Sequence, residues 1–180
     1  FFLLQQNQTR LGIECELDWK DNISNCFSDL IQKAHTQLGQ KVVVLVDEYD
    51  KPILDNITDA DIAREMRDGL RNLYSVIKDS DAHIQFAMLT GVSKFSKVSL
   101  FSGINQLNDI TIDARYSAIC GYTDVAVDSI FAPELVGLDR EAVRSWYNGY
   151  NWTGESVYNP FDLLLLFQKR EFRSYWFETG

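Results

Sequence analysis

VVVLVDEYD, residues 42 to 50, is the stretch that decides the fold of this chain. Its first five residues are apolar and mostly β-branched, which is typical of a strand that is buried on both faces in a parallel sheet. Two acidic residues, Asp47 and Glu48, follow directly where this strand would end. In an α/β fold, ligands collect at the carboxyl ends of the strands, so this stretch predicts both the fold class and the place of a site.

The neighbouring segments carry the alternating pattern of an α/β domain. Apolar residues at helical spacing predict helices over 22–38 and 62–78, and Gly39 is the expected C-cap of the first helix. A second apolar strand is expected over 84–89, and a third, shorter strand over 110–112. Helix, strand, helix and strand in this order predict a parallel sheet with helices on both faces.

The last third of the chain is richer in aromatic residues. We place a domain boundary near Gly121, which gives a core over 1–120 and a small, mainly helical lobe over 121–180. Within the lobe we expect helices over 123–131, 140–146 and 160–167, and a hairpin over 150–158.

Composition excludes several classes of protein. The chain has 180 residues with 17 Lys and Arg against 26 Asp and Glu, a formal net charge of −9, which argues against non-specific binding to nucleic-acid phosphates. The three cysteines, Cys15, Cys26 and Cys120, form no CxxC pair, so neither a disulfide framework nor a zinc site is expected. The apolar runs are far shorter than the roughly 20 residues that span a bilayer. We therefore expect a cytoplasmic protein without a membrane partner, and the absence of an initiator Met suggests a piece of a longer chain.

An apolar strand that ends in Asp-Glu is the Walker B arrangement of P-loop NTPases. In that arrangement Asp47 would hold the Mg²⁺ of a Mg-nucleotide through water, and Glu48 would polarise the water that attacks the γ-phosphate. An ordinary acidic loop after a buried strand gives the same pattern, and the spacing alone supports the two interpretations equally.

The second strand leads into polar residues at 90–94, which should lie at the same edge of the sheet. In such ATPases a polar residue on the strand beside Walker B senses the γ-phosphate, and Thr90 or Ser93 would fill that role, with Lys94 and Thr90 contacting the nucleotide. A plain turn and a solvated loop are the alternatives. If the two strands are neighbours, Asp47 should lie within hydrogen-bond reach of Thr90.

Six blocks of the sequence, taken in order, resemble the predicted AAA-ATPase-like family of bacterial proteins, whose members are often followed by a PD-(D/E)XK nuclease-like domain. The blocks are VVVLVDEYDKPIL (42–54), LTGVSKFSKVSLFSGINQLNDIT (89–111), CGYT (120–123), WYNGYNW (146–152), VYNPFDLLLLF (157–167) and YWFETG (175–180). The resemblance implies a P-loop ATPase core that uses ATP and Mg²⁺, with Asp47 and Glu48 as the Walker B pair and residues 90–93 as the sensor region. It also implies a nuclease-like domain in the same parent chain.

One departure from the family pattern is large. Family members carry a Walker A loop with a Gly-Lys-Ser core upstream of Walker B, and this sequence has none. The nearest match, residues 149–156, has Glu where Lys is required and would repel phosphate, so we reject it. We expect a P-loop NTPase-like three-layer core that lacks its first strand and phosphate loop, with part of its core facing water and low stability by itself. A degenerate ATPase is the alternative explanation.

The function that we expect is ATP binding and Mg²⁺-dependent hydrolysis by the parent protein, with this chain carrying Walker B and the sensor region. A non-catalytic interaction module with an ATPase fold is one alternative. A nuclease-associated protein that acts on nucleic acid is another, although the sequence shows no cluster of catalytic carboxylates with lysine.

Overall fold

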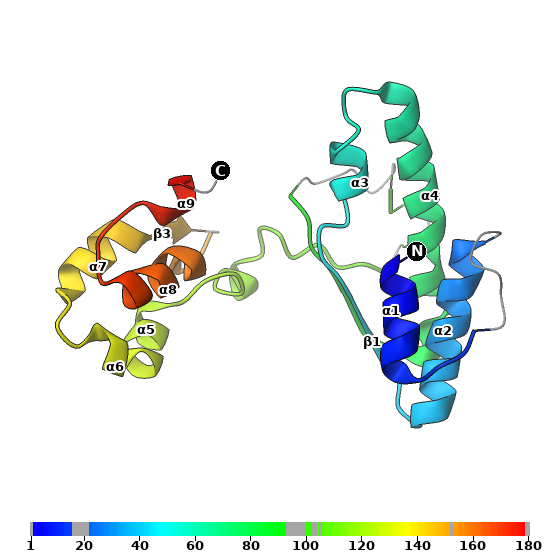
Figure 1. The fold of residues 1–180 in the computed structure, drawn as a ribbon, viewed down its shortest axis with the longest axis horizontal. Coiled ribbons are helices and arrows are strands. Elements are labelled where there is room, and N and C mark those ends of the chain that lie inside the picture. Colours follow the sequence, from blue (N-terminus) through cyan, green and yellow to red (C-terminus); the bar gives the residue numbers. More distant parts are fainter. Residues whose placement is uncertain are drawn as a thin grey trace. The chain divides into compact units, whose positions relative to one another are not determined.

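The computed structural model describes residues 2–15, 22–92, 100–101, 104, 106–151 and 153–178. The chain divides into two compact units, Phe1–Leu107 and Asn108–Gly180, which we call the N-terminal unit and the C-terminal unit (Figure 1). The domain boundary that the sequence predicts near Gly121 stays a prediction. No helix in the described part of the chain is long and apolar enough to cross a membrane.

The helices of the N-terminal unit begin and end at sequence signals. Its elements before the sheet's second strand are α1 (Phe2–Leu11), α2 (Ile23–Leu38), α3 (Lys51–Leu54), α4 (Ala60–Asp79) and the 3-10 helix η1 (Asp81–His83). The Asn22 side chain caps α2 by accepting from the Asn25 backbone, and Gly39 ends it in the left-handed conformation at φ 66°. Asp59 caps α4 in the same way, by accepting from the Ile62 backbone. The two predicted helices and the glycine C-cap are therefore confirmed.

The two predicted strands form the sheet of this unit. β1 (Val42–Val46) and β2 (Ile84–Leu89) pair in parallel, with Val44 opposite Ala87 and Val46 opposite Leu89. Each strand follows a helix, so the N-terminal unit has an α/β fold with a small parallel sheet, as the sequence predicts.

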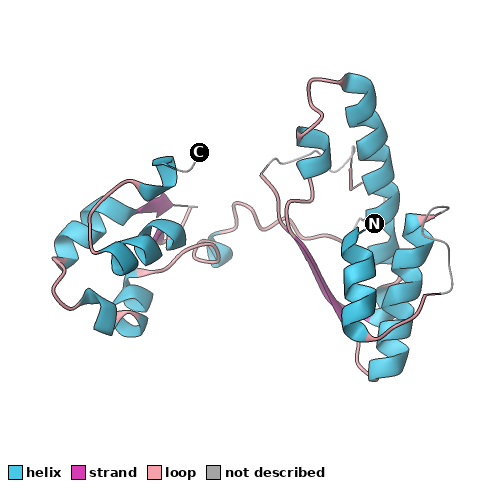
Figure 2. Ribbon diagram, viewed as in Figure 1, coloured by secondary structure: helices cyan, strands magenta, loops and turns pink. Residues whose placement is uncertain are grey.

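Helices cover this sheet on one face, not on two. Val44 is buried in a core that includes Ile31 of α2 and Tyr74 of α4. On the opposite face the side chains of Val43, Leu45 and Phe86 are 54%, 71% and 53% exposed. Figure 2 shows the strands lying against one side of the helices of this unit. For the described residues, the prediction of burial on both faces is wrong, because no described element packs on the outer face. The expectation that apolar core surface faces water agrees with these exposures.

The third predicted strand, over 110–112, is also wrong. These residues lie in an irregular segment and a turn, and the Ile112 side chain is 67% exposed. The Asp109 side chain accepts a hydrogen bond from the Thr111 backbone at 3.1 Å, which is the local bond of an Asx-type turn. A run of three β-branched residues without a strand partner does not outweigh such a turn.

The C-terminal unit is mainly helical, with one hairpin. Its elements are η2 (Ala114–Tyr116), α5 (Asp124–Ile130), α6 (Ala132–Leu135), α7 (Arg140–Tyr147), β3 (Asn148–Asn151), β4 (Ser156–Tyr158), α8 (Pro160–Lys169) and α9 (Tyr175–Glu178). β3 and β4 pair antiparallel, so the predicted hairpin and the predicted helices are confirmed. Their apolar faces meet in a core that contains Val127, Val143, Tyr158, Leu163 and Leu166.

Candidate functional site

The candidate site lies where β1 and β2 end. Pairing continues one step beyond the strands, because Thr90 donates its backbone N–H to the Val46 carbonyl at 2.8 Å and Tyr49 donates its own to the Thr90 carbonyl at 2.9 Å. These two bonds place the residue after β1, Asp47, beside the residue after β2, Thr90.

The side chains of Asp47 and Thr90 are in direct contact. Thr90 Oγ1 donates to Asp47 Oδ1 at 2.5 Å, and the backbone N–H of Glu48 donates to the same oxygen at 2.9 Å. Both side chains are exposed, and within the described part of the chain no hydrogen bond is made to Asp47 Oδ2. The predicted proximity is confirmed. The pair presents a carboxylate oxygen and a hydroxyl oxygen to solvent, which are the hard ligands that Mg²⁺ takes in proteins.

Glu48 adopts a backbone conformation that is uncommon for its residue type. Its φ is 52°, in the left-handed region, and Lys51 donates its backbone N–H to the Glu48 carbonyl at 3.0 Å. Such a conformation costs a non-glycine residue on the order of 1–3 kcal/mol and is found more often at functional sites. The tight turn leaves the Glu48 side chain exposed next to Asp47. Its position fits a group that orients a water molecule, although that role stays a prediction.

The next acidic residue, Asp50, is completely buried. Its Oδ1 accepts the backbone N–H of Val92 at 3.3 Å, across from the loop that follows Thr90. Gly91 makes this approach feasible, since a Cβ at that position would lie 2.6 Å from Asp50 Oδ1 and 2.7 Å from Tyr49 Cε1. The sequence assigns no role to Asp50, and its only signal there is its position two residues after Glu48.

Three aromatic residues, Tyr49, Tyr74 and Phe101, pack next to the site. Tyr74 of α4 donates its hydroxyl to the Tyr49 carbonyl at 3.1 Å, and the Tyr49 ring packs edge-on against Phe101 at 5.1 Å between centroids. Burial, with smaller contributions from the negative charge of Asp50 and from Tyr49, raises the pKa of Tyr74 to about 12. Tyr74 therefore stays a neutral donor at physiological pH, and α4 holds the turn after β1 in place.

Two of the predicted site residues, Ser93 and Lys94, lie outside the described residues. Within the residues that are described, no three His, Cys, Asp or Glu side chains gather as a ready-made metal site. A cation at Asp47 and Thr90 would therefore need water and phosphate oxygens to complete its shell, as Mg²⁺ in nucleotide sites does.

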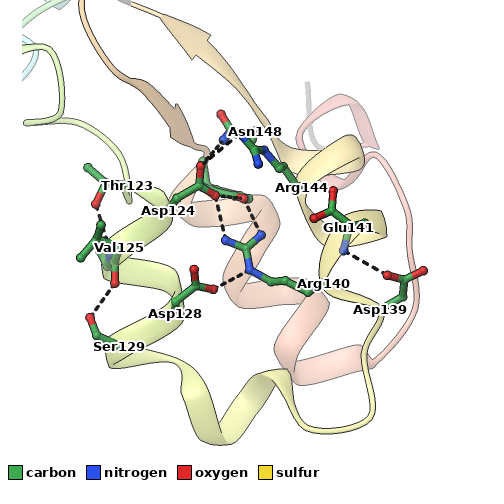
Figure 3. Close-up of polar contacts among 12 residues, drawn as sticks. Thr123, Asp124, Val125, Asp128, Ser129, Asp139, Arg140, Glu141, Arg144 and Asn148 are labelled. Atoms are coloured by element: carbon green, nitrogen blue, oxygen red, sulfur yellow. Dashed lines mark hydrogen bonds and ion pairs between the residues drawn. The ribbon is translucent and has the colours of Figure 1, made fainter.

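A second polar cluster, which the sequence did not reveal, joins three elements of the C-terminal unit (Figure 3). Asp124 of α5 accepts from Tyr158 Oη of β4 at 2.6 Å and from Arg140 Nη2 of α7 at 2.8 Å, and Arg140 Nε donates to Asp128 at 2.6 Å. The hydrogen bond from Tyr158, followed by that from Arg140, holds the pKa of Asp124 below its usual value. Each charge has an opposite partner within this unit, so the cluster fits a structural role, in which it holds α5, α7 and β4 together.

Taken together, the N-terminal unit is an α/β domain with a carboxylate and a hydroxyl joined at the carboxyl edge of its parallel sheet. The chain belongs to the AAA-ATPase-like family: the family model described as "Predicted AAA-ATPase" matches residues 2–101, more than half of the chain.

A relative from Azotobacter chroococcum mcd 1, described as "Uncharacterized protein in vnfD 5'region", is 71% identical over 178 residues. The match covers 99% of this chain and 34% of the relative, so the chain spans about a third of that protein's length. No solved structure matches the chain.

Proposed function

We propose that the full-length protein binds ATP with Mg²⁺ and hydrolyses it, and that this chain supplies the Walker B carboxylates and the γ-phosphate sensor. The observation that carries this proposal is the contact of Thr90 Oγ1 with Asp47 Oδ1 where two parallel strands end side by side. Family membership over residues 2–101 supports the same conclusion.

Each residue at this edge has a role that its position supports. Asp47 has a carboxylate oxygen available to hold Mg²⁺ through water, which helps to neutralise charge on the phosphates. Thr90 donates to that same carboxylate and would detect the γ-phosphate. Glu48, exposed on the strained turn, would orient the attacking water and take up its proton. Ser93 and Lys94 are proposed to complete the sensor region and the nucleotide contacts.

The outer face of the sheet bears on the architecture of the whole protein. In a three-layer P-loop core both faces of the sheet are covered by helices. We propose that Val43, Leu45 and Phe86, which are exposed in this chain, are covered in this way in the full-length protein. The same exposed face favours one second candidate, an interaction module with an ATPase fold that does not hydrolyse ATP.

ATP turnover by the full-length protein tests the proposal. Replacement Glu48→Gln keeps the size of the side chain and removes its basicity, so turnover should fall by about 10² or more while Mg-ATP binding is retained. Glu65→Gln, on an exposed position of α4, is the matched control and should leave turnover unchanged. Equal turnover of wild type and Glu48→Gln would remove the catalytic assignment. Binding of Mg-ATP without turnover in the wild type would favour the interaction module.

A further inference from the structure

The carboxylate of Asp50 is buried next to the candidate site and has no part in the proposed hydrolysis. Asp50 occupies the N-cap position of α3, but its side chain makes no capping hydrogen bond there. It reaches instead to the Val92 backbone N–H, 42 residues away. A carboxylate that is 0% exposed carries a desolvation cost, which only well-formed hydrogen bonds offset. The bond to Val92 therefore joins the turn after β1 to the loop after β2 at a buried position.

The connection lies next to the sensor. Thr90 is two residues before Val92, and its backbone already makes two bonds, one to Val46 at the end of β1 and one to Tyr49 in the turn that follows. The bond from Val92 to Asp50 adds a third anchor on the far side of Gly91. Residues 90–92 are therefore bonded to residues 46–50, the stretch of chain that includes Asp47.

The strained turn explains how one short segment can carry both the exposed Asp47 and the buried Asp50. Between Asp47 and Asp50 the chain passes through Glu48 at φ 52°, and the side chains on the two sides of this turn end in opposite environments. Asp47 is exposed at the edge, whereas Asp50 is buried beneath it. Gly91 leaves the space that the buried carboxylate needs.

We propose that Asp50 is a positioning residue that fixes the Gly91–Val92 backbone and so holds Thr90 Oγ1 against Asp47 Oδ1. This inference rests on the proposed function, since it assigns Asp50 to the sensor of that site. Asp50 does not touch nucleotide in this proposal. It acts through Thr90, and its loss should therefore affect turnover more than nucleotide binding.

The kinetic test uses the full-length protein with Asp50→Asn, which keeps an acceptor oxygen, and Asp50→Ala, which does not. A misplaced sensor should lower kcat by about tenfold or more in Asp50→Ala and less in Asp50→Asn, with the Kd for Mg-ATP changed less than about threefold. Asp55→Asn, an exposed residue that pairs with Lys51, is the control and should behave as wild type. If Asp50 acts through Thr90, the double variant Asp50→Asn/Thr90→Val should turn over no more slowly than Thr90→Val alone.

Amide hydrogen exchange on the same proteins gives a readout that does not depend on ATP turnover. Exchange at the Val92 N–H should be at least about tenfold faster in Asp50→Ala than in wild type and faster by a smaller factor in Asp50→Asn, while exchange at Val44, in the middle of β1, should not change. Unchanged exchange at Val92, or kcat effects of Asp50 and Thr90 variants that simply multiply, would overturn the proposal. A wild-type protein without ATP turnover would defeat the proposed function, and Val92 exchange would still decide whether Asp50 holds the loop. If Asp50→Ala does not fold, Asp50→Asn alone decides both tests.

Discussion

His35 and His83 face each other with their Nδ1 atoms 2.9 Å apart, joining the last turn of α2 to the 3-10 helix that leads into β2. Their rings meet edge to face at 5.1 Å between centroids. At this distance one Nδ1 donates a hydrogen bond and the other accepts it, so the two rings are hydrogen-bonded to each other. It fixes the start of β2 against the helix that precedes β1.

Loss of either ring should therefore cost the same interaction. We expect His35→Ala and His83→Ala each to lower the free energy of unfolding by about 1 kcal/mol, the usual net value of one hydrogen bond. The double variant should be less destabilised than the sum of the two single variants. Urea unfolding followed by circular dichroism measures all three, and strictly additive losses would show that the rings do not interact in solution.

Gly91→Ala should disturb the site, because the new Cβ would lie 2.6 Å from Asp50 Oδ1 and 2.7 Å from Tyr49 Cε1. We expect a loss of about 1–3 kcal/mol in the free energy of unfolding, typical of overpacking. Gly69→Ala is the matched control: Gly69 lies inside α4 with nothing within 4 Å of its would-be Cβ, so it should gain up to about 1 kcal/mol. Thermal melts that show the two variants shifting in the same direction would contradict the packing around Asp50.

Asp124 should make the stability of the C-terminal unit depend on acid. Its pKa is lowered in the folded state, so its contribution is complete above the ordinary aspartate pKa of about 3.9 and is lost as pH falls through the lowered value. Tyr158→Phe removes the strongest cause of that shift and should flatten the acid dependence. Melting temperatures between pH 7 and pH 3 measure the effect.

The same cluster offers a comparison of two carboxylates at neutral pH. Asp124→Asn should lower the free energy of unfolding by about 1–3 kcal/mol, because Asp124 has hydrogen bonds from both Tyr158 and Arg140. Asp128→Asn removes one bond to Arg140 at a side chain that is 56% exposed, and should cost less than about 1 kcal/mol. The reverse order would mean that Arg140 depends mainly on Asp128.

The 180-residue chain by itself should not bind Mg-ATP appreciably, because its sequence contains no Gly-Lys-Ser or Gly-Lys-Thr loop to hold the β- and γ-phosphates. Calorimetric titration with Mg-ATP is the measurement. A micromolar Kd would show that another loop of this chain binds the phosphates, and the rejection of residues 149–156 would have to be withdrawn.

The proposed cover on the outer face of the sheet can be tested by comparing this chain with the full-length protein. Leu45 is 71% exposed here, so Leu45→Gln should change the free energy of unfolding of this chain by less than about 0.5 kcal/mol. If a further layer covers that face in the full-length protein, the same change should cost about 1.5–3 kcal/mol there. Val44→Ala, on the buried face, should destabilise both proteins.

The sequence by itself determined the elements whose signals are local. Helical spacing and the caps at Asn22 and Gly39 define α2, and an unbroken β-branched run defines β1. The contact of Asp47 with Thr90 was also predictable, because the carboxyl ends of adjacent parallel strands lie at the same edge. The strand prediction at 110–112 failed because three β-branched residues carry no information about whether a partner strand exists.

Only the tertiary structure separated the three acidic residues Asp47, Glu48 and Asp50. In sequence they are near neighbours of the same charge, but the turn at Glu48 leaves two of them exposed and Asp50 fully buried. Burial of a charge depends on what packs over it, here the Gly91–Val92 backbone that arrives from a distant part of the chain. The pairing of Asp124 with Arg140 and Tyr158 has the same cause. The contact of Asp47 with Thr90 follows from the pairing of two strands, whereas these contacts depend on how loops, helices and the hairpin pack, and a residue's own neighbours do not encode that packing.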